Sequence, residues 1–353
     1  MKKIRVGING FGRIGRLVAR VMAKRERFEI VAINDIIDTT STEKYAEGVK
    51  MLADLFKWDS AHKKFDGEVL AKGDGIRVDG HTIKVVSSKD PAQIPWGKEL
   101  DFVVESTGVF RKRDQIAGHL RSGKVRRVLL SVPPKDQIDA VVVKGVNDYI
   151  LKKEHTIISN ASCTTNCLAP IVKVLHENFG LHHGLMTTVH AYTMDQNLLD
   201  SIHKSDPRRA RSAAANIVPT STGAAKTIGK IIAEMDGRLD GMAIRVPVVD
   251  GSLVDLTVKL EKTPKDSAQM VQAVNEAMKM AAENELKGIL EYSEDPLVSS
   301  DIVDNPHSSI FDSLSTMALT DTGMVKVVSW YDNEWGYSNR CVDIMEHMVD
   351  LDG

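Results

Sequence analysis

The feature that most constrains the fold of this chain is a predicted strand followed at once by a glycine-rich turn and an amphipathic helix. Residues 3–8 have the pattern of a buried strand, and Gly10, Gly12 and Gly15 then form the motif G-x-G-x-x-G. Apolar side chains recur after the turn at helical spacing, at Ile14, Leu17, Val18, Val21 and Met22. Glycines in this context permit a tight turn and let a pyrophosphate approach the helix N-terminus closely. The arrangement predicts a dinucleotide-binding unit.

A carboxylate after the second predicted strand indicates which dinucleotide binds. Residues 28–33 read as a strand that leads to Asp35, twenty residues after Gly15. A carboxylate at this spacing can accept hydrogen bonds from the adenosine ribose hydroxyls, and its charge repels a 2′-phosphate. We therefore predict NAD rather than NADP. The alternative is a glycine turn followed by an ordinary turn aspartate.

The pattern of strands and helices predicts an α/β protein with two kinds of sheet. In the first part we expect a helix over 41–57, small antiparallel strands up to 86, and buried strands over 100–105 and 125–130. Strands that alternate with helices predict a doubly wound parallel (Rossmann) sheet. In the second part, apolar and polar residues alternate over 254–260, which predicts an α+β domain with an antiparallel sheet. Further expected elements are a strand over 185–193, a polar turn over 219–226 before a helix, a helix capped near Asp266, and a last strand over 324–330 followed by a helix.

Size and charge narrow the classes of function. The 353 residues suggest two domains, and a net charge of −2 gives no reason to expect nucleic acid or an anionic membrane as a partner. Three cysteines are too few for a disulfide framework. The chain enters a strand without an apolar leader, and no apolar run approaches membrane-spanning length. We therefore expect a cytoplasmic protein.

The candidate nucleophile is a cysteine surrounded by small and hydroxyl residues. Cys163 lies in the stretch ASCTTNC, between a predicted strand and a helical pattern. At a helix N-terminus, unpaired backbone N–H groups and the helix dipole favour the thiolate, which is the nucleophilic form. The alternative is a small buried cysteine, and the neighbouring hydroxyl and amide side chains argue against it. We interpret Cys167, one turn later, as packing.

A nucleophilic cysteine needs a base or a cationic partner, and His190 is the best candidate among eleven histidines. It lies among threonines in a predicted strand, where a histidine of the core is the alternative. The pair His182-His183 has no carboxylate or cysteine at ligand spacing, so no metal site is expected. The arginines of 208–211 lack interleaved aromatic residues, which favours a solvated or inter-subunit loop over a nucleic-acid site.

A dinucleotide fold combined with an activated cysteine indicates the oxidation of an aldehyde through a thiohemiacetal and a thioester. An alcohol dehydrogenase would need no nucleophilic cysteine, and a cysteine hydrolase would need no NAD site. These residues alone leave the acceptor of the acyl group open among phosphate, water and a thiol.

A set of sequence motifs resembles those of the phosphorylating glyceraldehyde-3-phosphate dehydrogenases. The resemblance runs from residue 3 to residue 350 and rests on NGFGRIGR, ESTGVF, SNASCTTNCLAP, TTVHAYT, RRAR, PTSTGAAK and WYDNEWGYSNR. It implies an NAD-binding domain over 1–162, completed by a C-terminal helix over 334–353, and a catalytic domain over 163–333. It also implies reversible oxidation of D-glyceraldehyde 3-phosphate to 1,3-bisphosphoglycerate with NAD, as in glycolysis and gluconeogenesis.

The resemblance also assigns roles to individual residues. Cys163 resembles the family nucleophile, whose backbone N–H would hold the developing oxyanion, and His190 resembles its activating acid and base. The implied site for inorganic phosphate contains Ser162, Thr164, Thr222 and Gly223, and the implied site for the C3 phosphate of the substrate contains Thr193, Asp195 and Arg245. The implied cofactor contacts are Gly10, Gly12, Arg13, Ile14, Gly15, Asp35, Lys89, Ser131, Asn333 at the nicotinamide amide and Tyr337 near its ring.

Family members are homotetramers in which the segment 191–215 reaches a neighbour's cofactor site, and we expect the same here. Ser201-Ile202 stand where many NAD-specific members have Leu-Pro. A serine at this position tolerates a 2′-phosphate better than an apolar residue does, which leaves dual use of NAD and NADP open. The link over 36–56 is longer than usual, and a surface elaboration is the simplest interpretation.

Two other functions compete with this one. An erythrose-4-phosphate dehydrogenase shares the thiol chemistry but hydrolyses its acyl-enzyme, and it typically departs from the Thr-Gly signature that Thr222 and Gly223 retain. A non-catalytic NAD-sensing or RNA-binding scaffold is the second alternative. The intact set of Cys163, His190 and Arg245 argues against it.

Overall fold

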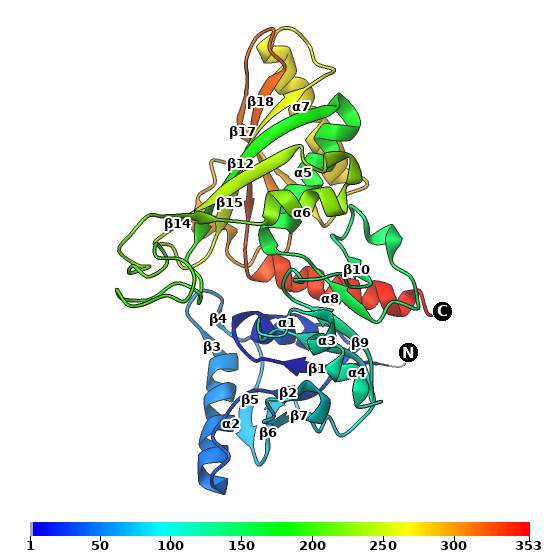
Figure 1. Ribbon diagram of the computed structural model, residues 1–353, viewed down its shortest axis with the longest axis vertical. Helices are drawn as coiled ribbons and strands as arrows, with labels where there is room; N and C mark the ends of the chain where they lie inside the picture. Colours follow the sequence, from blue (N-terminus) through cyan, green and yellow to red (C-terminus); the bar gives the residue numbers. More distant parts are fainter. Residues whose placement is uncertain (1–2) are drawn as a thin grey trace. The chain divides into compact units, whose positions relative to one another are not determined.

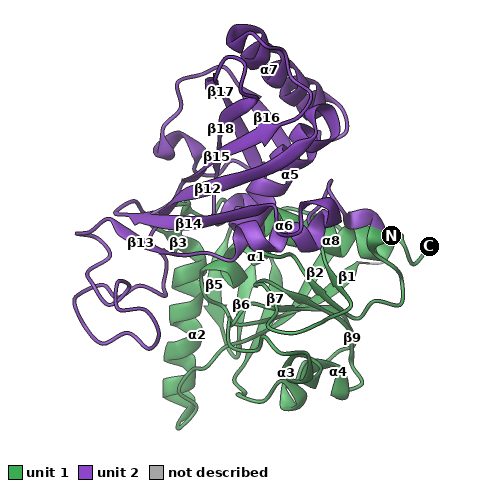
Figure 2. Ribbon diagram, turned by 45° about the horizontal axis from the view of Figure 1, so that its top comes forward, with its two compact units in different colours: residues 1–142, 150–161, 338–353 green, residues 143–149, 162–337 purple. Residues whose placement is uncertain are grey.

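The computed structural model describes residues 3–353, which divide into two compact units (Figure 2). Unit 1 contains the residues up to 142 together with 150–161 and 338–353, and unit 2 contains 143–149 and 162–337. The division differs from the predicted domain limits, because residues 143–149, Ser162 and residues 334–337 group with unit 2.

Unit 1 is built on a nine-stranded sheet in the order β10-β11-β9-β8-β1-β2-β7-β6-β5. All neighbours from β10 to β7 pair in parallel, and the last three strands pair in an antiparallel manner. The parallel strands are almost wholly apolar and buried, as a sheet covered on both faces requires. The strands are β1 (Ile4–Asn9), β2 (Phe28–Asn34), β5 (Val69–Lys72), β6 (Gly75–Val78), β7 (His81–Val86), β8 (Leu100–Glu105), β9 (Val125–Leu130), β10 (Ala140–Val141) and β11 (Ile157–Ser159), with a separate hairpin of β3 (Trp58–Asp59) and β4 (Lys63–Lys64).

The helices of unit 1 begin where the sequence predicts them. Helix α1 (Arg13–Ala23) follows the glycine turn, and α2 (Thr42–Lys57) is capped by Ser41, whose hydroxyl accepts from the backbone N–H of Lys44 at 3.2 Å. The shorter helices are α3 (Arg113–Ile116), α4 (Gly118–Arg121) and the 3₁₀ turns Pro91–Gln93 and Asp148–Ile150.

The C-terminal helix α8 (Trp335–Asp350) belongs to unit 1 from Ser338 onward. Arg25 pairs there with Asp343 at 2.7 Å and with Glu346 at 2.8 Å. These ion pairs attach the last helix to the N-terminal unit, at the turn that follows α1.

Unit 2 is built on a seven-stranded sheet in the order β13-β14-β12-β15-β18-β17-β16. The central strands pair in an antiparallel manner as predicted, whereas β12 with β14 and β16 with β17 are parallel, so the sheet is mixed. Helices α5 (Cys163–Phe179), α6 (Ala224–Ile231) and α7 (Ser267–Glu283) pack against it (Figure 1). The strands are β12 (Leu181–Ala191), β13 (Val218–Ser221), β14 (Leu239–Val246), β15 (Ser252–Leu260), β16 (Leu290–Ser293), β17 (Ser309–Ala318) and β18 (Met324–Tyr331), and short 3₁₀ turns cover Ala233–Met235 and Ser299–Ile302.

Local sequence explains most of unit 2, with one correction. Strand β15 alternates strictly between buried and half-buried residues, and Asp266 caps α7 by accepting from the N–H of Gln269, both as predicted. The polar stretch 219–226 was predicted to be a turn, but its first part belongs to β13. Its backbone pairs with β14, where Val218 lies opposite Arg245, and this pairing overrides the polar composition.

No helix in the described part of the chain is long and apolar enough to cross a bilayer.

Candidate active site

The candidate nucleophile lies at the first residue of a helix, as the sequence predicts. Helix α5 begins at Cys163, and the hydroxyl of Ser162 accepts from the backbone N–H of Thr165 at 3.1 Å. This cap satisfies one of the free N–H groups of the first turn and leaves those nearest the thiol available to an anion. The Cys163 side chain is half-buried.

Strand β12 brings His190 to the thiol. His190 is the next-to-last residue of β12, and its Nε2 lies 3.6 Å from the Sγ of Cys163. This separation fits a hydrogen bond to sulfur, so the imidazole can accept the thiol proton directly.

The surroundings of the other ring nitrogen select the tautomer of His190. Its Nδ1 lies 2.7 Å from the carbonyl oxygen of Ala191 and 3.0 Å from Nη1 of Arg245. The same Nη1 can instead donate to the Ala191 carbonyl at 3.0 Å and to Oγ1 of Thr193 at 2.9 Å. The Ala191 carbonyl can only accept, so the proton resides on Nδ1. Nε2 is then an acceptor aimed at Cys163.

Burial and charge set the protonation of the pair. Burial, and next the positive charge of Arg245, lower the pKa of His190 from its ordinary value to about 3, so the imidazole is neutral at neutral pH and one ring nitrogen can accept a hydrogen bond. Burial raises the pKa of the Cys163 thiol, against the charge of Arg245 and the hydrogen bonds of Thr164. The loss of hydration thus opposes the effect of the helix terminus on the thiol, and the imidazole at 3.6 Å offers an acceptor for the thiol proton.

A buried tyrosine that the sequence did not single out connects the two elements of the pair. The hydroxyl of Tyr331 lies 2.9 Å from Oγ1 of Thr164, in the first turn of α5, and 2.9 Å from Oγ1 of Thr188, on β12. Its ring meets that of His190 edge-on, with the centroids 5.9 Å apart. The alternation of β18 directly before Asn333 is the signal that could have identified Tyr331.

The residues predicted for the C3 phosphate form one hydrogen-bonded cluster. Arg245 donates to Thr193, the Thr193 hydroxyl donates to Asp195, and Asp195 pairs with Arg209. Partial burial raises the pKa of Asp195, but the Thr193 hydrogen bond and the charges of Arg245 and Arg209 lower it below its usual value. Sequence reasoning missed Arg209, because it read the arginines of 208–211 only as a loop. Two guanidinium groups around hydroxyls form a suitable site for a dianion.

The residues predicted for inorganic phosphate lie at the starts of two helices of unit 2. Ser162 and Thr164 lie at the start of α5, and Thr222 and Gly223 precede α6, where Thr222 accepts from the N–H of Ala224 at 3.2 Å. Helices α5 and α6 pack against each other. The hydroxyl of Thr164 is engaged by Tyr331, so Thr164 has only part of its hydrogen-bonding capacity left for a ligand.

In unit 1 the predicted cofactor residues collect at the carboxyl ends of the parallel strands. Gly10 adopts a φ of +91°, which only glycine tolerates well, and a side chain at Gly12 would enter open space. Asp35 follows β2 and accepts from the N–H of Phe11 at 2.6 Å, which fixes the glycine turn. Gly15 and the half-buried Ile14 lie in α1, Ser131 follows β9, and Lys89 is exposed after β7. A glycine turn of this kind, open at Gly12 and beside the start of α1, fits a dinucleotide.

Arg13, another predicted cofactor contact, is already paired within unit 1. Its guanidinium donates to both carboxylate oxygens of Asp59, at 2.9 and 3.1 Å. A bidentate pair of this kind fixes the direction of the side chain at the first residue of α1.

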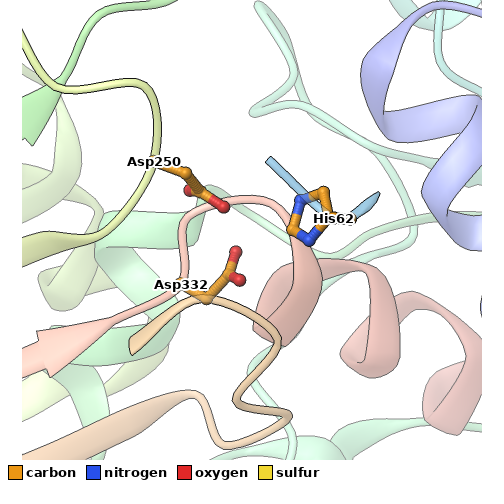
Figure 3. A group of neighbouring side chains, drawn as sticks. All are labelled: His62, Asp250 and Asp332. Atoms are coloured by element: carbon orange, nitrogen blue, oxygen red, sulfur yellow. The ribbon is translucent and has the colours of Figure 1, made fainter. Parts of the chain in front are cut away.

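The remaining predicted cofactor residues lie in unit 2, around the end of β18. Asn333 and Tyr337 are both buried. The preceding Asp332 accepts from the N–H groups of Asp304 and Glu334, at 2.8 Å each, so its carboxylate shapes the turn that carries Asn333. The carboxylates of Asp332 and Asp250 point toward each other (Figure 3).

Comparisons with known proteins agree with this geometry. Residues 4–113 match the NAD-binding domain of glyceraldehyde 3-phosphate dehydrogenase, and residues 162–333 match its C-terminal domain. The chain is 52% identical over 348 residues to glyceraldehyde-3-phosphate dehydrogenase from Priestia megaterium, with 98% of each chain covered.

The chain belongs to the glyceraldehyde-3-phosphate dehydrogenase family. Further members of this family resemble it over nearly the whole length. The glyceraldehyde-3-phosphate dehydrogenase of Geobacillus stearothermophilus is 51% identical over 348 residues, with 98% of each chain covered. A cytosolic glyceraldehyde-3-phosphate dehydrogenase of Arabidopsis thaliana is 48% identical over 350 residues, again with 98% of each chain covered. The predicted family, the fold class and the use of NAD are thereby confirmed.

Proposed function

We propose that this protein oxidises D-glyceraldehyde 3-phosphate to 1,3-bisphosphoglycerate, with Cys163 as the covalent nucleophile and NAD as the oxidant. The observation that carries the proposal is the 3.6 Å separation of Sγ and a neutral imidazole Nε2, with anion-binding residues beside them. Membership of the family supports the same activity.

The first step forms the bond between sulfur and carbon. The Cys163 thiol gives its proton to Nε2 of His190, and the sulfur attacks the aldehyde carbon. The backbone N–H of Cys163, at the start of α5, stabilises the developing oxyanion. The imidazolium then returns the proton to this oxygen, which gives a neutral thiohemiacetal.

The second step makes the thioester. NAD, when bound, supplies the acceptor for the hydride that leaves the aldehyde carbon. His190 takes the hydroxyl proton as the hydride departs, which leaves an acyl group on Cys163 and an imidazolium.

The third step releases the product. An oxygen of inorganic phosphate attacks the thioester carbon, the bond to sulfur breaks, and His190 protonates the departing thiolate. Ser162, Thr164, Thr222 and Gly223 are proposed to bind the attacking phosphate. Arg245, Thr193 and Asp195 are proposed to form the site of the C3 phosphate. The guanidinium of Arg245 and the hydroxyl of Thr193 would contact the phosphate, and the carboxylate of Asp195 orients Thr193 by accepting its hydroxyl proton.

Dependence on phosphate tests this function against its nearest rival. With glyceraldehyde 3-phosphate and NAD, NADH formation should require phosphate or arsenate for multiple turnovers and stop near one equivalent per site without them. Steady turnover that is unaffected by omission of phosphate would indicate hydrolysis of the acyl-enzyme, as in an erythrose-4-phosphate dehydrogenase. A chain that binds NAD but oxidises no aldehyde would be a non-catalytic scaffold.

We propose that the protein prefers NAD to NADP. The carboxylate of Asp35 lies at the glycine turn, where it accepts from the N–H of Phe11. A 2′-phosphate near this charge would be repelled. Steady-state kcat/KM with each nucleotide measures the preference, and a clear preference for NADP would contradict the role of Asp35.

We also propose a homotetramer that acts in the cytoplasm. Large apolar side chains of the segment 191–215 are exposed, and Ile202 is 99% exposed. Such a group of apolar residues on a loop is typical of an interface between subunits. The remaining members of this exposed group are Met194, Leu198 and Leu199. Native mass spectrometry that finds only monomers at micromolar concentration would contradict the assembly.

A further inference from the structure

A buried serine hydroxyl bridges the strand that carries His190 and the side chain of Asn333. The Oγ of Ser252 accepts from the backbone N–H of Ala191 at 3.1 Å and donates to Oδ1 of Asn333 at 2.6 Å. Ser252 is 1% exposed, and all three residues lie in unit 2. No step of the proposed mechanism uses this serine.

The end of the ladder between β12 and β15 explains why a side chain makes this contact. The last backbone pair is Val189 with Leu253, so Ala191 lies beyond the ladder. The chain turns away at Gly251, where φ is +85° and a Cβ would collide with the carbonyl oxygen of Ser299. The backbone can no longer accept from Ala191, and the Ser252 hydroxyl takes its place.

The Ser252 hydroxyl accepts one hydrogen bond and donates the other. A serine hydroxyl has one proton, and the N–H of Ala191 can only donate, so the proton of Ser252 is free to be donated to Asn333. In the structure Oδ1 of Asn333 lies at this hydroxyl, so the NH₂ group of the amide points away from Ser252. Within residues 3–353 the NH₂ group donates to no protein atom, which leaves it available to a ligand acceptor.

The backbone around Asn333 is held separately from its side chain. The carboxylate of Asp332 accepts from the N–H groups of Asp304 and Glu334 and thus fixes the turn. With the backbone fixed, the Asn333 side chain can still rotate its amide group about its torsion angles. The hydrogen bond from the Ser252 hydroxyl restricts this rotation.

We propose that Ser252 is a positioning residue that holds the Asn333 amide with its NH₂ group toward the carboxamide oxygen of nicotinamide, and thereby selects the ring face that receives the hydride. The inference rests on the proposed function and on the proposed contact between Asn333 and the nicotinamide. A carboxamide held by a fixed donor cannot turn over, so one face of the ring is presented to the substrate.

The variant Ser252→Ala removes the restriction while leaving the Asn333 side chain in place. Its dissociation constant for NAD, measured by fluorescence titration without substrate, should rise about three- to tenfold, as expected for one lost hydrogen bond. Oxidation of glyceraldehyde 3-phosphate deuterated at C1 should place deuterium on one face of NADH in the wild type. In Ser252→Ala, NMR should detect a fraction on the other face.

Matched variants separate positioning from stability. Ser313→Ala removes another buried hydroxyl of unit 2, which donates to the Ser293 carbonyl at 2.7 Å, and should leave the NAD affinity and the stereochemistry unchanged. In an Asn333→Ala background, Ser252→Ala should raise the dissociation constant by less than about twofold, since it acts through Asn333. If Ser252→Ala does not fold, Ser252→Cys, which has nearly the same shape and a weaker donor, should show an intermediate effect.

The outcomes distinguish this inference from the proposed function. Unchanged NAD affinity and strict stereochemistry in Ser252→Ala, or an equal loss of affinity in the Asn333→Ala background, would overturn the role of Ser252. Absence of aldehyde oxidation by the wild type would instead overturn the proposed function. The titrations of NAD would still show whether Ser252 contributes to NAD binding.

Discussion

The Nε2 atom of His190 lies 3.6 Å from the Sγ of Cys163, and the Nδ1 atom of the same ring lies 2.7 Å from the Ala191 carbonyl. One hydrogen bond orients the ring, and the opposite nitrogen faces the nucleophile. Burial raises the pKa of the thiol, and the neighbouring imidazole offers an acceptor for its proton.

Replacement of the sulfur should abolish the chemistry while sparing the cofactor site. Cys163→Ser should lower kcat for aldehyde oxidation on the order of 10⁴-fold or more, because a hydroxyl is far harder to ionise beside the same imidazole. The dissociation constant for NAD should change by less than about twofold, since Cys163 belongs to none of the proposed cofactor contacts. Undiminished turnover in this variant would refute the nucleophile.

Replacement of the base should slow both formation and oxidation of the thiohemiacetal. His190→Asn should lower kcat about 10²- to 10⁴-fold and slow the alkylation of Cys163 by iodoacetamide at pH 7. Stopped-flow measurement of the NADH burst checks the first effect, and mass spectrometry of the alkylated peptide checks the second. Equal alkylation rates in wild type and variant would show that His190 does not accept the thiol proton.

The low pKa of His190 predicts a specific acid sensitivity. The unfolded chain protonates this histidine near pH 6.5, whereas the folded chain does so only near pH 3. Between these values the unfolded state binds more protons, so this group removes stability as the pH falls from about 6.5 toward 3.

Urea unfolding at pH 7 and pH 5 checks this acid sensitivity. The free energy of unfolding should fall less in His190→Asn than in wild type, whereas replacement of the exposed His81 should leave the fall unchanged. An equal fall in all three proteins would contradict the buried neutral state of His190.

Removal of the guanidinium of Arg245 should affect the phosphorylated substrate selectively. Arg245→Ala should lower kcat/KM for glyceraldehyde 3-phosphate about tenfold to 100-fold, as expected for a charged hydrogen bond to phosphate. Arg245 also contacts His190, so glyceraldehyde without phosphate is the internal control. If kcat/KM falls by the same factor for both aldehydes, Arg245 acts on the histidine and not on the phosphate.

Local patterns were sufficient to predict the framework of the site. The glycine turn and Asp35 follow from a motif of fixed spacing, the strand β15 follows from its alternation, and the start of α5 follows from the polar residues around Cys163. In each case the signal lies within a few neighbouring residues, and tertiary packing only reinforces it.

The features that sequence reasoning missed depend on contacts between distant segments. Tyr331 acquires its role only because β18 brings it to Thr164 and Thr188, which lie more than 140 residues away in the chain. The protonation of Cys163 depends on how deeply unit 2 buries the thiol, which no local pattern encodes. Likewise, residues 218–221 form a strand because β14 offers a partner.

The most direct test of the central claim is mass spectrometry of the enzyme after mixing with glyceraldehyde 3-phosphate and NAD in the absence of phosphate. We predict one phosphoglyceroyl group per chain, located on the peptide that contains Cys163 and removed when phosphate is added. NADH formation with no acyl group on Cys163, or with the group on Cys167 or Cys341, would contradict it.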